Sequence, residues 1–197
     1  MQVEGLKDSI RETPIQVAER ASWIDYAKVI GIWLVVYGHT PGHYFVHWIF
    51  IFHMPLWFIL SGYLYKPRNF QAELKRTIPV LVIPYVLYNI IIAPPNYLTI
   101  EEIINVILGN QEQLPPEFRP MWFIVSLFTI RILGSLFKSN LYVMGLISFL
   151  AFLIIHYRGI IPYNNDFFQA YTTLICSVFF VVGFYRRSSI LPWMVTL

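Results

Sequence analysis

The sequence predicts an all-α, multi-pass transmembrane helical bundle of about six to seven spans with a cytoplasmic N-terminus. Of its 197 residues, 57% are hydrophobic and 13% are charged, whereas a soluble domain carries about 25% charged residues. Several apolar segments each approach the roughly 20 residues that a spanning helix needs. They cover 24–41, 47–65, 78–95, 121–137, 140–157 and 167–185, and a further one begins near Ile190.

The basic residues between these segments predict the orientation, because cytoplasmic loops of membrane proteins are enriched in lysine and arginine. With the N-terminus inside, the outer connectors hold only Arg119 and Arg158. The inner connectors hold Lys66, Arg68, Lys75, Arg76, Lys138, Arg186 and Arg187. The basic residues that set the membrane orientation therefore account for the net charge of +3. We expect the lipid bilayer as a partner and no nucleic acid.

The polar residues 1–22 predict a cytoplasmic segment ahead of a membrane domain over 23–197. They are too many and too weakly basic for the first region of a signal peptide, and Asp25 and Lys28 interrupt the apolar run that would follow. The first helix is therefore expected to remain in the mature protein. The single cysteine, Cys176, rules out a disulfide within the chain.

Ionisable residues line one face of the first apolar segment. Lys28 and His39 are eleven positions apart, which brings them within about 20° of three full turns and about 16 Å apart along a helix. Asp25, three residues before Lys28, joins the same face. Because charge is costly inside a membrane, such residues usually line a functional cavity. The plainer alternative is an Asp25–Lys28 pair near the lipid headgroups, with His39 at the opposite rim.

Two histidines are the strongest candidates for chemistry. The short turn after the first segment predicts that His53, in the second segment, lies at the depth of His39. A histidine accepts a proton near neutral pH or carries a transferred group. The spacing alone therefore fits a proton relay, an anion path or group transfer across the membrane. No third ligand accompanies the pair, so we expect no metal.

The connectors contribute further candidates. The basic connector 66–77 (KPRNFQAELKRT) is either a positive-inside anchor or a phosphate clamp, because guanidinium groups pair with phosphates. Arg131, well inside 121–137, either extends toward the membrane surface or faces a cavity. Ser61 and Gly62 favour close helix packing over nucleophilic attack. The acidic connector 96–120 contains an expected interfacial helix over 100–108.

These residues carry a resemblance to a known family. Lys28, ten intervening residues and His39 resemble the basic-x10-His signature of the membrane acyltransferase type-3 family, in its sugar and polysaccharide O-acetyltransferase branch. The blocks WIDYAKVIGIWLVVYGH, FHMPLWFILSGYL, KRTIPVLVIPY and PMWFIVSLFTIRIL resemble successive family blocks over about 23 to 134. The first motif has lysine where arginine is common, which keeps the charge and loses bidentate pairing.

The resemblance implies a cytoplasmic (inner) membrane enzyme that transfers an acyl group, expected to be acetyl, from acetyl-CoA or another acyl-CoA to a sugar or polysaccharide hydroxyl. His39 would act as general base or transient acyl carrier with help from His53, and Lys28, held by Asp25, would face the thioester or the pantetheine arm. The implied donor-binding residues are Arg68, Lys75, Arg76 and Arg131. The family has ten or so helices, so the chain is expected to be its N-terminal portion. A transporter or flippase, and an inactive partner in a polysaccharide assembly complex, are the alternatives.

Overall fold

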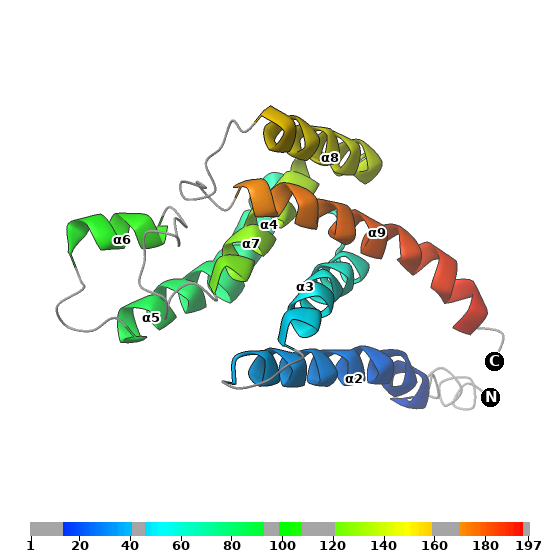
Figure 1. Cartoon of the computed structure of the whole chain (residues 1–197). Helices are drawn as coiled ribbons and strands as arrows, with labels where there is room; N and C mark the ends of the chain where they lie inside the picture. The colour runs from blue at the N-terminus through cyan, green and yellow to red at the C-terminus, as the bar shows by residue number, and fades with distance from the viewer. Residues whose placement is uncertain (1–13, 41–45, 93–98, 108–120, 159–169, 195–197) are drawn as a thin grey trace, which may run out of the picture. The chain divides into compact units, whose positions relative to one another are not determined.

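The computed structural model describes residues 14–40, 46–92, 99–107, 121–158 and 170–194, and all regular elements in these ranges are helices. The chain forms two compact units, Met1–Trp57 and Phe58–Leu197, which are described separately below. The all-α prediction is therefore confirmed for the part of the chain that the structure describes (Figure 1).

The first unit contains helix α2 (Pro14–Gly38) and the first two thirds of α3 (Val46–Tyr63). Gly31 of α2 is buried, and a methyl group added at this position would lie 2.9 Å from the indole ring of Trp57. The absence of a side chain at Gly31 therefore lets the two helices approach closely. Such small-residue contacts are a common way for helices to associate in membranes.

In the second unit, the end of α3 crosses α9 (Ala170–Met194) with almost no space between the two backbones. A Cβ atom added at Gly62 would overlap the carbonyl of Phe180, and one added at Gly183 would overlap the carbonyl of Ile59. Each glycine thus faces the backbone of the other helix. The expectation that Ser61 and Gly62 serve close packing is confirmed for Gly62.

We expect Gly62→Val to remove most of the folded protein. Its side chain would meet the backbone of Phe180 and not a movable side chain, so the cost should exceed the roughly 1–3 kcal/mol of ordinary overpacking. The measurement is the yield of monodisperse protein in size-exclusion chromatography, with the neighbouring Ser61→Ala as control. A normal yield for Gly62→Val would contradict the close crossing.

The basic connector is largely helical, which corrects its interpretation as a loop. Helix α4 (Phe70–Thr77) begins after Asn69, whose side chain accepts a 2.9 Å hydrogen bond from the Ala72 amide. It continues without a break through a π-helical turn, η1 (Ile78–Val82), into α5 (Ile83–Ile92). Pro79 lacks an amide hydrogen, and its ring crowds the preceding turn, which accounts for the wider turn at this point.

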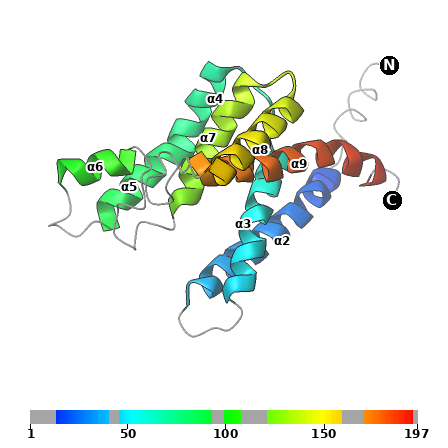
Figure 2. The ribbon, with the colours of Figure 1, turned by 45° about the horizontal axis from the view of Figure 1, so that its top comes forward.

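The core of the second unit lies where α7 (Trp122–Leu136), α8 (Leu141–Arg158) and α9 meet. Phe58, Tyr65, Ile130 and Phe180 are fully buried there. Helix α8 packs along α9, and α4 packs beside α7 (Figure 2). The short helix α6 (Ile100–Ile107) confirms the helix expected over 100–108, and it is tied to α5 by a 2.9 Å hydrogen bond from the Tyr85 hydroxyl to the Val106 carbonyl.

Two of the described helices are long and apolar enough to cross a membrane: Phe70–Ile91 and Leu141–Arg158. Shorter apolar helices cover Ile51–Tyr63, Trp122–Leu136 and Ala170–Arg186. The third predicted span therefore belongs to a helix that begins eight residues earlier than 78, within the basic connector. The total of six to seven spans and the cytoplasmic N-terminus stay predictions.

Candidate functional site

The charged stripe predicted in the first apolar segment lies along α2. The Lys28 Nζ is 3.3 Å from the Asp25 Oδ1, one helical turn away, so these two residues form an ion pair. The side chains are 43% and 66% exposed, respectively, so the pair lies on the open surface of the helix. His39 directly follows α2, and its amide still bonds to the Val35 carbonyl at 3.2 Å, which keeps it in helical register. All three predicted residues thus belong to one helical run.

The hydrogen bond of the His39 ring assigns its tautomer. The Nδ1 atom lies 2.8 Å from the Val35 carbonyl oxygen. Because a carbonyl only accepts hydrogen bonds, Nδ1 must carry the hydrogen and donate. In the neutral ring the lone pair is then on Nε2, at the tip of the exposed side chain. This is the protonation pattern that a general base requires.

His53 in α3 has the same local arrangement in a different environment. Its Nδ1 lies 2.7 Å from the Ile49 carbonyl, so its Nε2 also carries the lone pair. The side chain is fully buried, whereas His39 is exposed. The expected proximity of the two rings stays a prediction.

Helix α4 buries the acidic residue of the connector and exposes two of its basic residues. Lys75 and Arg76 lie in its last turn and are exposed. Glu73 and Thr77, which are four residues apart and share a face, are buried, and the Thr77 hydroxyl donates to the Glu73 carbonyl at 2.7 Å. The sequence QAELKRT therefore forms a helix that buries one carboxylate and presents two cations.

The buried Glu73 binds the arginine from α7. Its Oε1 accepts a 2.7 Å hydrogen bond from the Arg131 Nε and forms an ion pair with the Arg131 Nη2 at 2.6 Å. Glu73 is fully buried, and the Arg131 side chain is 17% exposed. The Arg68 Nη1 is 3.8 Å from the other carboxylate oxygen, which is close enough for an ion pair but too far for a hydrogen bond.

Tyr65 completes this cluster. The Arg131 guanidinium carbon lies 5.5 Å from the centre of the Tyr65 ring, in the range of a cation–π contact. The Tyr65 hydroxyl donates to the Arg131 backbone carbonyl at 3.4 Å. We call Arg68, Glu73, Arg131 and Tyr65 the arginine cluster. It contains two guanidinium groups and one carboxylate, so it keeps a net positive charge next to Lys75 and Arg76.

The roles of Glu73 and Tyr65 were not apparent from the sequence, although one signal pointed to Glu73. It is the single acid in the connector 66–77, and Arg131 is the single charged residue in 121–137. A single charge within an apolar segment, such as Arg131, is expected to pair with an opposite charge. The sequence separation of 58 residues hides this pairing from any analysis of periodicity. Of the predicted donor-binding residues, the structure thus brings Arg68 and Arg131 together around Glu73.

Comparison with known protein families gives one match. Residues 21–192 match the family model described as an acyltransferase domain, that of the type-3 acyltransferases. No curated protein and no solved structure matches the chain. The match includes α2 with its charged stripe, the basic connector and the arginine cluster. The resemblance based on Lys28 and His39 is therefore confirmed, and the chain belongs to the acyltransferase type-3 family of membrane acyltransferases.

Proposed function

We propose that the protein transfers an acyl group, most simply acetyl, from acyl-CoA to a hydroxyl of a glycan at the cytoplasmic (inner) membrane. The observation that carries this proposal is the His39 ring, because the bond from its Nδ1–H to the Val35 carbonyl leaves the lone pair on Nε2 of an exposed residue. Family membership supports the acyl transfer. The proposal adds the donor, the acceptor and the roles of the individual residues.

In the proposed reaction, the His39 Nε2 removes the proton of the acceptor hydroxyl. The hydroxyl oxygen attacks the thioester carbonyl, a new C–O bond forms, and the C–S bond breaks. The departing thiolate takes the proton back from the imidazolium, so the enzyme ends unchanged. A positioned base of this kind typically contributes about 10²–10⁴-fold in rate. A thioester is already an activated acyl donor, so the proposal needs no metal.

Lys28 is proposed to face the thioester or the pantetheine arm. Its Nζ lies 3.3 Å from the Asp25 carboxylate, and its side chain is 43% exposed, so it can interact with a further group. His53 is proposed to orient or assist His39. The neutral tautomer of each ring follows from its own backbone bond.

The proposed donor-phosphate site is the basic face formed by Arg68, Lys75 and Arg76. Lys75 and Arg76 are exposed on one side of α4, and Arg68 lies at the edge of the arginine cluster. Arg131 was predicted to bind the donor as well, and this stays a prediction. The structure adds that its guanidinium holds Glu73. The excess positive charge of the cluster would favour a nearby phosphate.

The direct test is turnover of acetyl-CoA by the purified protein, with and without a membrane glycan extract. We expect free CoA to appear only when the extract is present, and mass spectrometry to show an added acetyl group on the glycan. Release of CoA without any modified glycan would contradict the proposed acceptor. Absence of CoA release with every acyl-CoA would contradict the donor.

Replacing Lys75 and Arg76 together by glutamine should raise the KM for acyl-CoA roughly threefold to tenfold at low salt and leave kcat unchanged, because exposed charges contribute modestly. The KM of this variant should also respond less to salt, since screening acts on the charges that were removed. Lys138→Gln, which removes another exposed cation, is the control. If the KM of the double variant at low salt equals that of the parent protein, these residues serve only to set the orientation of the chain in the membrane.

A further inference from the structure

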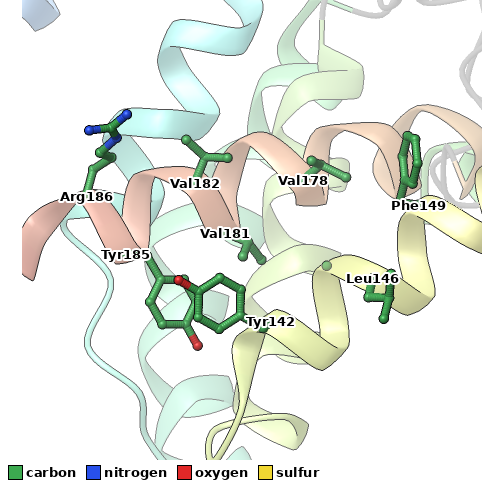
Figure 3. Close-up of a pocket in the computed structure, with 9 residues that line it drawn as sticks. Tyr142, Leu146, Phe149, Val178, Val181, Val182, Tyr185 and Arg186 are labelled. Atoms are coloured by element: carbon green, nitrogen blue, oxygen red, sulfur yellow. The ribbon is translucent and has the colours of Figure 1, made fainter.

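An open groove runs between α8 and α9 on the second unit, with a volume of about 620 Å³. Leu146 and Phe149 line it from α8, and Val178 and Val182 line it from α9 (Figure 3). The two helices pack tightly beneath it, since a Cβ atom added at Gly145 would lie 3.2 Å from the Val181 side chain. The groove is therefore a shaped apolar depression, within the usual size range of small-molecule sites.

One end of the groove is polar. The rings of Tyr142 and Tyr185 stack there, with 3.5 Å between their centres and 15° between their planes. Arg186 follows Tyr185 in α9, and its guanidinium extends away from the apolar lining (Figure 3). Arg186 is exposed. The aliphatic part of the groove thus ends at two stacked phenol rings and, on the other side of α9, at a cation (Figure 3).

This gradient matches an anionic amphiphile. An aliphatic chain would cover Leu146 and Val182, and a phosphate would pair with the Arg186 guanidinium, which has the fork geometry for two phosphate oxygens. An apolar helix placed over the same groove would offer no opposite charge to the guanidinium at its end. The charge at the end of the groove therefore favours an anionic lipid over a protein helix.

We propose that the groove between α8 and α9 binds an acyl chain of an anionic phospholipid, with the lipid phosphate at Arg186. In the expected orientation Arg186 lies at the cytoplasmic leaflet, where anionic lipids concentrate. The lining of the groove shares no residue with those assigned to acyl transfer. The lipid proposal therefore does not depend on the proposed function, and either can be contradicted without affecting the other.

The test compares phosphatidylglycerol with phosphatidylcholine, both with dioleoyl chains, by titration into the detergent-solubilised protein and native mass spectrometry. We expect phosphatidylglycerol to bind more tightly. Arg186→Gln should weaken its binding about fivefold, the effect of one basic residue at a lipid surface, and should leave phosphatidylcholine unchanged. Lys138→Gln, which removes a cation outside the groove, is the matched control and should change neither.

A second pair of variants tests the apolar part. Val182→Trp, and independently Leu146→Trp, should fill the groove and reduce binding of both lipids. Val143→Trp places the same side chain on an exposed position of α8 outside the lining and should have no effect. Melting temperatures of all variants in detergent identify any that fail to fold, and Arg186→Gln, at an exposed site, still tests the proposal in that case.

Several results would overturn the proposal. Equal affinity for the two lipids would show that the charge of the lipid does not contribute to binding. An equal loss of phosphatidylglycerol binding in Arg186→Gln and Lys138→Gln would show that Arg186 has no specific role. Unchanged lipid binding in both folded tryptophan variants of the groove would place the lipid elsewhere. A dimer in the parent protein that disappears in Val182→Trp would show that a second copy of the chain covers the groove.

Discussion

Replacing His39 by alanine is expected to lower acyl transfer by about 10² or more, the usual contribution of a positioned general base. The loss should appear in kcat, because His39 acts on the proton of the acceptor and not on binding of the donor. His39→Gln should be equally impaired, since an amide can form hydrogen bonds but cannot accept the proton. The measurement is CoA release under saturating acyl-CoA and acceptor.

The amount of folded protein should not change in this variant. His39 is exposed, and its Nδ1 donates a hydrogen bond to the carbonyl of Val35, four residues before it in the same helical run. His156→Ala is the matched control, because His156 is an exposed histidine near the end of α8 whose Nδ1 is 2.7 Å from the Tyr171 hydroxyl. A fully active His39→Ala protein would exclude His39 from the mechanism.

Much of the first helix could be predicted from the sequence because its chemistry is local. The angular spacing of Asp25, Lys28 and His39 depends only on helix geometry, and the structure confirms the Asp25–Lys28 pair and the helical register of His39. The backbone bonds that assign both histidine tautomers also join residues four apart. The spacing could not show that the Asp25–Lys28 pair lies on an open surface, because exposure depends on the other helices.

The basic connector shows why the rest of the site could not be predicted. Its polar composition suggested a loop, but Asn69 caps a helix and the acid of that helix is neutralised by an arginine from α7. Once Glu73 is paired, its turn can be buried, and the helix begins at Phe70 instead of near 78. This contact between residues far apart in the sequence determines how the connector folds. It cannot be predicted from the helix propensities of the connector itself.

Replacing Glu73 by alanine should therefore lower the stability of the second unit markedly. The change leaves the Arg131 guanidinium, 17% exposed, and the neighbouring Arg68 without their carboxylate. Removing one partner of a buried ion pair typically costs about 3–5 kcal/mol, because the remaining charge is uncompensated. We expect a markedly lower melting temperature in detergent. Glu101→Ala on α6, where the acid is exposed, should melt like the parent.

The double variant Glu73→Met with Arg131→Met separates charge from packing. Replacing both partners by apolar side chains of similar length removes the uncompensated charge, so it should recover much of the stability lost in either single variant. A double variant no more stable than the weaker single variant would show that the ion pair is not what joins α4 to α7. If the double variant recovers its stability and still has a higher KM for acyl-CoA than the parent protein, the charges of Glu73 and Arg131 contribute to donor binding in addition to the fold. The cluster would then be part of the donor site.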